Sequence, residues 1–214
     1  MKHLRILLAD DHAVVIEGLR RMLGHLEFEV VGAVSDGRAL LHAAARLQPD
    51  AIIADIAMPL LNGIDAAREI HKQSPRTKII FLTMHSETVY ATAALAAGAS
   101  GFVLKSAAEE EMISAIREAL AGRIYISKTI AKSVKRAREV RTAHDGSAVD
   151  GLTRRQREVL QLLAEGRQAK EIAVALNVSP KTVEFHKGLI MKKLDLHSTA
   201  ELTRYAIENG IAGA

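Results

Sequence analysis

The sequence predicts a doubly wound α/β fold, in which a five-stranded parallel sheet is covered by helices, followed by a smaller all-α domain of four helices. Five short apolar runs alternate with five helical patterns in the first part of the chain. Short joints between such units are typical of a doubly wound parallel sheet. Four further helical patterns follow in residues 152–210 and predict the second domain.

The strands and helices of the sheet can be placed in order along the chain. The run Ala51-Ile52-Ile53-Ala54 is purely apolar, which suits a strand buried on both faces. Ser35-Asp36-Gly37 and Pro75 supply turn residues between units. We expect strands near residues 4–9, 28–34, 51–54, 78–82 and 101–104, and helices near 13–25, 37–47, 63–73, 87–97 and 107–121.

Composition excludes several classes of protein. The chain is 49% hydrophobic and 25% charged, which favours a folded core over disorder. It contains no cysteine, so disulfides, thiol nucleophiles and zinc–thiolate sites are excluded. No apolar run approaches the roughly 20 residues of a membrane helix, and the first residues lead into a strand pattern rather than a signal peptide. We therefore expect a cytoplasmic protein with no membrane partner.

Charge divides the chain into three parts. Residues 1–122 hold 12 Lys and Arg against 15 Asp and Glu, residues 123–150 hold 7 against 3, and residues 151–214 hold 10 against 7. We expect domains at 1–122 and 151–214, joined by a linker at 123–150 with a short amphipathic helix near 127–140 and a flexible part at 141–151. The basic back half suggests a polyanionic partner, most simply nucleic acid.

Polar residues stand where the predicted strands end. Asp10 and Asp11 follow the first strand, Asp55 the third, Thr83 the fourth and Lys105 the fifth. Because the carboxyl ends of parallel strands meet at one edge, we expect these five side chains in one pocket. Carboxylates that lie so close to one another need a counter-ion, and their oxygens suit Mg²⁺. A carboxylate nucleophile beside an ammonium and a metal has the parts for phosphoryl transfer.

The second domain carries the signals of a helix-turn-helix. Thr153 and Gln156 form a predicted capping box that opens its first helix. Asn177 can end a short helix from Lys170 in the left-handed conformation, and Ser179 followed by proline starts the next. A short helix, a tight turn and an N-capped second helix are typical of this motif. A last helix follows Ser198 and stops at Gly210.

These residues resemble two known motifs. The strand-end set, together with Phe102 three residues before Lys105, is similar to the flavodoxin-like receiver domain of bacterial two-component response regulators. The runs at 152–160, 170–173, 179–186 and 193–194 resemble the LuxR-type helix-turn-helix. Together the two motif sets cover nearly the whole chain and resemble the NarL/FixJ class of regulators.

The resemblance implies roles for the pocket residues. Asp55 would be phosphorylated by a sensor histidine kinase, and Asp11, Asp55 and the backbone carbonyl of Ala57 would bind Mg²⁺, with Asp10 acting through water. Thr83 and Lys105 would contact phosphoryl oxygens, and Phe102 would turn inward as Thr83 moves. Ala57 and His85 face incoming water in the family, so we expect them to tune the lifetime of the phosphoryl group; the alternative for His85 is an exposed loop histidine.

The resemblance also implies a DNA-reading helix and a dimer. In the helix after Ser179, helical spacing turns Val183, Ile190, Met191 and Leu194 inward and Glu184, Phe185 and Gly188 outward. By resemblance the outward three face the bases of double-stranded promoter DNA. The candidates for phosphate contacts are Lys181, Thr182, Lys187, Lys192 and Lys193. The last helix would form the homodimer, promoted by phosphorylation, and Asp195 stands where a glycine is usual.

We therefore predict a phosphorylation-dependent transcription regulator rather than an enzyme, catalysing only its own phosphorylation and dephosphorylation. One rival is a DNA-binding regulator whose receiver does not depend on phosphorylation. The other is an aspartyl-phosphate phosphatase, but such sites use a second aspartate as general acid, and here that position is Ala57. Equal labelling of wild type and Asp55→Asn by acetyl phosphate would support the first rival. Turnover of p-nitrophenyl phosphate well beyond one equivalent would support the second.

Overall fold

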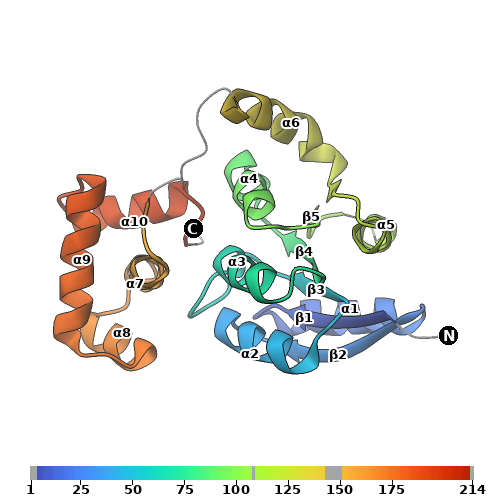
Figure 1. Cartoon of the computed structure of the whole chain (residues 1–214), viewed down its shortest axis with the longest axis horizontal. Helices are drawn as coiled ribbons and strands as arrows, with labels where there is room; N and C mark the ends of the chain where they lie inside the picture. Colours follow the sequence, from blue (N-terminus) through green and yellow to red (C-terminus); the bar gives the residue numbers. More distant parts are fainter. Residues whose placement is uncertain (1–3, 108, 143–150, 213–214) are drawn as a thin grey trace. The chain divides into compact units, whose positions relative to one another are not determined.

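The computed structural model describes residues 4–107, 109–142 and 151–212, and within 137–142 only the backbone. The chain divides into two compact units, residues 1–140 and 141–214 (Figure 1). The first unit is an α/β domain and the second is built of helices. The predicted fold class is confirmed. The predicted division at residues 122 and 150 stays a prediction.

A single parallel sheet forms the centre of the first unit. Its strands lie in the order β2-β1-β3-β4-β5-β6. Strand β2 therefore lies on one side of β1, and β3 to β6 follow in order on its other side. In β3 all four residues are buried, as the apolar run predicts. The strands are β1 (Leu4–Ala9), β2 (Phe28–Val34), β3 (Ala51–Ala54), β4 (Lys78–Thr83), β5 (Gly101–Leu104) and β6 (Tyr125–Ile126).

Helices cover both faces of the sheet, and successive strand residues alternate between two cores. Leu7, Ile52 and Phe81 pack in one core with residues of α2, α3 and α4. Leu8, Ile53 and others pack in a second core with residues of α1 and α5. The helices are α1 (Ala13–Gly24), α2 (Gly37–Leu47), α3 (Gly63–Gln73), α4 (Thr88–Ala96) and α5 (Glu109–Leu120) (Figure 1).

The segment after α5 contributes more to this unit than the sequence patterns predict. The two residues of β6 pair with Gly101 and Phe102 and make a sixth parallel strand, which the patterns do not reveal. Helix α6 (Lys128–Thr142) confirms the predicted helix near 127–140. Its residues Ile130 and Val134 are buried in the core that contains Phe102. The predicted flexible part at 141–151 lies mostly outside the described residues.

The second unit has the four predicted helices: α7 (Arg154–Ala164), α8 (Ala169–Leu176), α9 (Pro180–Leu194) and α10 (Thr199–Glu208). One aliphatic core, which includes Leu160, Ile172, Val183 and Leu202, joins them. None of the helices in the described parts of either unit combines the length and hydropathy that a bilayer span requires.

Candidate functional site

The strand ends of the first unit converge at one edge of the sheet. The backbone N–H of Asp55 donates to the carbonyl of Ala9 over 2.8 Å, which places the end of β3 beside the end of β1. The N–H of Lys105 donates to the carbonyl of Thr83 over 2.8 Å, which places the end of β5 beside that of β4. The parallel pairing of the strands therefore gathers the polar residues that follow them.

Lys105 joins the two buried carboxylates of this edge. Its Nζ lies 2.7 Å from Oδ2 of Asp10 and 2.7 Å from Oδ2 of Asp55, and the two carboxylate side chains are only 3% and 5% exposed. Burial lowers the pKa of Lys105, but hydrogen bonds and attraction from Asp10 and Asp55 outweigh it and raise the pKa above its ordinary value. The ammonium is therefore charged at neutral pH and holds both carboxylates in place.

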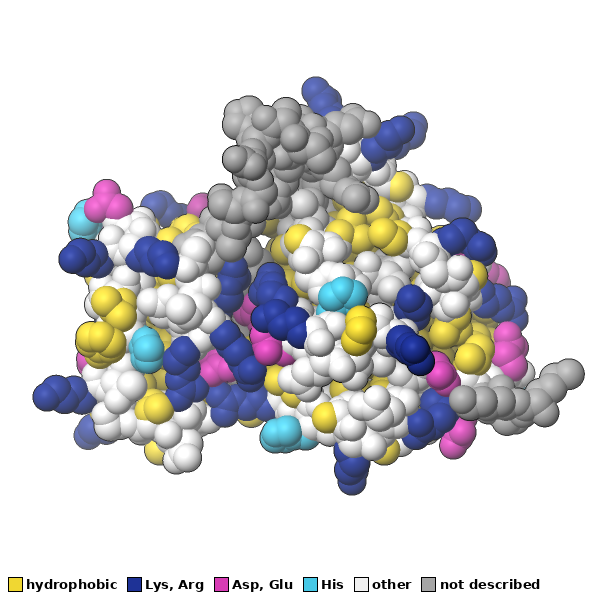
Figure 2. Space-filling view, in the orientation of Figure 1, with side chains coloured by type: hydrophobic (Ala, Val, Ile, Leu, Met, Phe, Trp, Pro, Cys, Tyr) yellow, Lys and Arg dark blue, Asp and Glu magenta, His cyan; other side chains and the backbone are white. Residues whose placement is uncertain are grey.

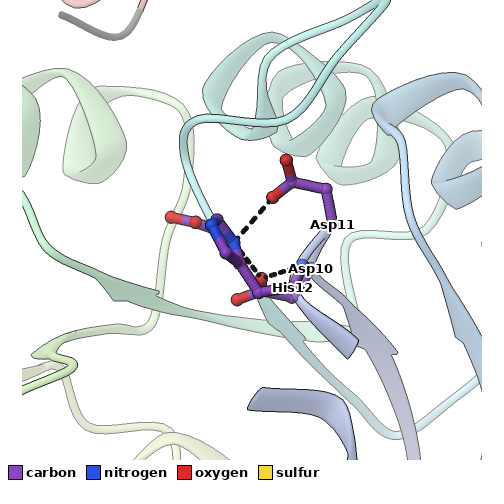
Figure 3. A group of neighbouring side chains, drawn as sticks. Asp10, Asp11 and His12 are labelled. Carbon is purple, nitrogen blue, oxygen red and sulfur yellow. Dashed lines mark hydrogen bonds and ion pairs between the residues drawn. The ribbon is translucent and has the colours of Figure 1, made fainter. Parts of the chain in front are cut away.

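A third carboxylate and a histidine complete the cluster. Asp10, Asp11 and His12 point toward one another (Figure 3), with Nδ1 of His12 lying 3.0 Å from Oδ1 of Asp10 and 2.9 Å from Oδ1 of Asp11. Together with Asp55, each residue offers one ligand atom within 4.8 Å of the others. Hard carboxylate oxygens on a largely buried floor fit a divalent cation, so this cluster could hold a metal ion.

His12 is a member of this cluster that the sequence patterns do not predict. Its position directly after Asp10 and Asp11 at a strand end was the available signal. The backbone N–H of His12 also donates to Oδ1 of Asp10 over 2.8 Å. That bond fixes one oxygen of the carboxylate while Lys105 holds the other.

The loop after β3 fixes Asp55 from the other side. Oδ1 of Asp55 accepts a hydrogen bond from the N–H of Ile56 over 2.6 Å, and the N–H of Gly63 donates to the carbonyl of Ile56 over 2.9 Å. A Cβ on Gly63 would lie 2.1 Å from the carbonyl oxygen of Asp55, so only glycine allows this approach. Ala57 is half-buried within the loop.

Thr83 and Phe102 are both fully buried. The Oγ1 of Thr83 accepts a hydrogen bond from the N–H of His85 over 3.2 Å. The ring of His85 stacks on Tyr90 of α4, with centroids 4.2 Å apart and an interplanar angle of 23°. His85 is thus half-buried and packed on α4 rather than an exposed loop histidine. Thr83 is thereby linked through this loop to α4.

The second unit contains a helix, a tight turn and a helix, in α8, residues 177–179 and α9. Asn177 ends α8 in the left-handed region at φ 52°, which asparagine tolerates. Oγ of Ser179 accepts a hydrogen bond from the N–H of Thr182 over 3.1 Å, and Pro180 is the first helical residue. Asp195, in place of the usual glycine, also adopts a left-handed φ of 53° and ends α9. The helix boundaries therefore follow from local capping chemistry.

The outward face of α9 carries an exposed phenylalanine near its centre and exposed lysines toward both ends. Phe185 is 63% exposed and Glu184 and Gly188 are exposed, while Val183 and Ile190 are buried as predicted. Figure 2 shows hydrophobic side chains on this part of the surface. Lys181, Lys192 and Lys193 are exposed, whereas Thr182 and Lys187 are half-buried. Nζ of Lys193 also contacts the carbonyl of Gly151.

An ion-pair network in this unit was also missed from the sequence. Glu158 of α7 is 5% exposed. Its carboxylate lies 3.0 Å from Arg154 and 2.8 Å from Arg155. Arg155 also donates to the carbonyl of Leu176 over 2.7 Å, where α8 ends. The network ties α7 to the turn before α9. The predicted capping box of Thr153 and Gln156 is present and starts α7.

Fold and site together define a protein of two units, with a cluster of carboxylates bridged by a lysine at the edge of a parallel sheet and a separate helix-turn-helix. Residues 6–117 match the response regulator receiver domain, and residues 150–206 match the bacterial regulatory proteins of the luxR family. The chain belongs to the response regulators that join a receiver domain to a LuxR-type DNA-binding domain.

Relatives match along the whole chain. It is 33% identical over 212 residues to the response regulator UvrY of Escherichia coli K12, covering 99% of this chain and 97% of UvrY. It is 38% identical over 211 residues to the oxygen regulatory protein NreC of Staphylococcus carnosus, covering 96% and 97%. A structure of the response regulator RcsB of Salmonella typhimurium is similar with a TM-score of 0.65 and 31% identity, covering 98% and 99%.

Proposed function

We propose that this chain is a phosphorylation-dependent transcription regulator, in which Asp55 accepts a phosphoryl group from a sensor histidine kinase and the change controls dimerisation and DNA binding. The observation that carries the proposal is the bridge from Lys105 to Asp10 and Asp55, at 2.7 Å each, on the carboxyl edge of the sheet. A cation in contact with Asp55 supports the choice of this carboxylate as the nucleophile. Asp55 is buried, and the exposed Asp11 offers a ligand atom within 4.8 Å of it.

In the proposed transfer, a carboxylate oxygen of Asp55 attacks the phosphorus of a phosphohistidine on the kinase. The O–P bond forms as the N–P bond breaks, and the departing imidazole nitrogen keeps that electron pair and takes up a proton. The negative charge at Asp55 then moves onto the phosphoryl oxygens. The ammonium of Lys105 can then pair with a phosphoryl oxygen, because it already contacts Asp55. Because the leaving nitrogen can take its proton from water, the transfer needs no acid side chain from this protein, consistent with Ala57 two residues after Asp55.

The residues present fit Mg²⁺: Asp11, Asp55 and the backbone carbonyl of Ala57 would hold it, and Asp10 would act through water. When bound, Mg²⁺ would offset the charge that gathers on the transferring oxygens. The water-mediated role of Asp10 is proposed from the resemblance to receiver domains, and its two oxygens contact Lys105 and His12. Ala57 and His85 are proposed to set the access of water to the phosphoryl group.

The proposed switch begins at Thr83, whose hydroxyl would leave the N–H of His85 and bond a phosphoryl oxygen. Because His85 stacks on Tyr90, this exchange would disturb the start of α4. Phe102 has no hydroxyl, so its response is driven by packing alone. A change in relative stability of two arrangements is sufficient to change the affinity for DNA.

The proposed DNA contact is the outward face of α9. Glu184 can accept from a cytosine amino group and Phe185 can touch a thymine methyl, while Gly188 lets the helix lie close to the duplex. The phosphate contacts are proposed for Lys181, Thr182, Lys187, Lys192 and Lys193. A second copy would join through α10. A structure of RcsB, 29% identical with a TM-score of 0.59, is described as bound to a promoter in the presence of the phosphomimetic BeF3⁻.

Because a bacterium keeps its DNA in the cytoplasm, we place the proposed action there. The test is binding of full-length protein to duplexes selected from a random-sequence pool, with and without beryllofluoride and Mg²⁺. We expect a gain of about 5- to 150-fold in affinity, the usual range of coupling between two sites. The same gain in Asp55→Asn, or no gain in wild type, would contradict the proposal.

A further inference from the structure

Helix α6 has one apolar side, and that side is part of the first unit. Ile130 is 5% exposed and Val134 is fully buried. Both belong to the buried cluster that contains Tyr90 of α4 and Phe102 of β5. The side chains stand four residues apart, one above the other on the same helix face. The helix is therefore fixed to the α/β unit by its own hydrophobic contacts.

The start of α6 is fixed by hydrogen bonds as well. The N–H of Ser127, which is 1% exposed, donates to the carbonyl of Phe102 over 2.8 Å. Its hydroxyl donates to Glu111 of α5 over 2.6 Å and accepts from the N–H of Leu104 over 3.3 Å. These bonds tie the first turn of α6 to the end of β5 and to α5, so α6 presents its outer side in a defined orientation.

The outer side of α6 is a row of cations. Lys128, Lys132, Lys135 and Arg136 are all exposed, and their spacing places them within an arc of about 100°, opposite Ile130 and Val134. Dark blue side chains project from the surface where α6 lies (Figure 2). The span from Lys128 to Arg136 contains no acidic residue, and in the described part of the chain none of the four has an ion-pair partner.

Four cations along one helix face repel one another and favour an extended anion. The row is about 12 Å long at 1.5 Å per residue. Duplex DNA carries one negative charge per about 1.7 Å of helix axis, so a row of this length lies against several phosphates. We propose that this row, Lys128, Lys132, Lys135 and Arg136, binds the phosphate backbone of duplex DNA as a second contact, independent of sequence and separate from α9.

This inference rests on the proposed DNA binding of the chain, which it extends to a second surface. The proposal requires that both surfaces contact one duplex. The nine peptide links between Thr142 and Gly151 can span at most about 32 Å when extended, which corresponds to roughly nine base pairs at 3.4 Å each. The row would add affinity for the DNA that flanks the bases touched by α9, without adding discrimination between bases.

The test is the salt dependence of binding to a fluorescent duplex of mixed sequence, measured by anisotropy with the full-length chain. Each phosphate contact contributes about 0.9 to the slope of log K against log salt concentration. The double variant Lys132→Gln and Lys135→Gln should therefore flatten the slope by up to about 1.8. A fourfold rise in salt should then weaken its binding roughly twelvefold less than it weakens wild type.

Two further variants make the result specific. Lys72→Gln with Arg76→Gln removes the same charge from exposed positions of the same unit and should leave the slope unchanged. The double variant Lys187→Gln and Lys192→Gln tests α9. If the slope flattens in this variant but not in the α6 variant, this inference alone is overturned. If it flattens in the α6 variant but not in the α9 variant, the proposed role of α9 is overturned.

The inference is overturned if the α6 variant keeps the wild-type slope, or if the control pair flattens it equally. It is also overturned if the α6 variant changes only self-association in sedimentation, since the row would then bind the acidic surface of a second copy. Circular dichroism of each variant checks that α6 stays folded.

Discussion

Replacing Lys105 by methionine would remove the one ammonium that lies 2.7 Å from both Asp10 and Asp55. The two carboxylate side chains are at most 5% exposed, so the variant would leave two buried negative charges without their cation. Breaking a buried ion pair by removing one partner typically costs 3–5 kcal/mol. Hydrogen bonds from the N–H groups of His12 and Ile56 still hold one oxygen of each carboxylate, so we expect about 3 kcal/mol at neutral pH.

The proposed metal site predicts that the stability of Lys105→Met depends on magnesium. A divalent cation can replace the lost positive charge, so magnesium chloride should stabilise Lys105→Met more than wild type. The pKa of Lys105 is raised in the folded chain. Its contribution is therefore complete below its ordinary value of 10.5 and is lost only as pH rises through the higher folded value. The difference between the two proteins should thus be constant around neutral pH and shrink in strong alkali.

The assay is urea unfolding of the full-length chain followed by circular dichroism, with and without magnesium. The control is Lys72→Met, an exposed lysine 3.1 Å from Glu69, which should cost less than about 1 kcal/mol. A loss at Lys105 as small as at Lys72, or equal stabilisation of both proteins by magnesium, would refute the reasoning.

Three further outcomes are expected. Ser127→Ala should cost about 1–3 kcal/mol in urea unfolding, because it leaves a buried N–H of β5 without its acceptor; a change within 0.5 kcal/mol, as at an ordinary surface site, would argue against this role. Gly63→Ala should displace Asp55 and slow its labelling by acetyl phosphate, whereas Gly18→Ala, with no atom within 4 Å of the added carbon, should not. Ala57→Asn should change the dephosphorylation rate of the labelled protein, and an unchanged rate rejects the proposed control of water access.

The sequence predicts most of the sheet because its strands are apolar runs that end in polar residues. Residues 51–54 illustrate this, since all four are buried and Asp55 follows directly. Parallel pairing then brings Asp10, Asp55 and Lys105 to one edge of the sheet. This can be predicted from the sequence because each of these residues follows the end of a predicted strand. The helix boundaries around α9 are equally local, because Ser179 and Pro180 act through their own backbone and side-chain chemistry.

Contacts that depend on the completed fold could not be predicted in this way. Strand β6 has only two half-buried residues, too few for a period to be recognised. Ser127 has an ordinary sequence context and gains its role only when α5 and β5 lie beside it. The same holds for Glu158, whose partners on α7 are visible in the sequence but whose link through Arg155 to Leu176 is not.

Mass spectrometry of the intact protein after incubation with acetyl phosphate tests the central claim most directly. With Mg²⁺, wild type should gain one phosphoryl group and Asp55→Asn none, and wild type should gain none when the metal is chelated. Equal labelling of the two proteins, or labelling that is indifferent to the metal, would contradict a magnesium-dependent acceptor at Asp55.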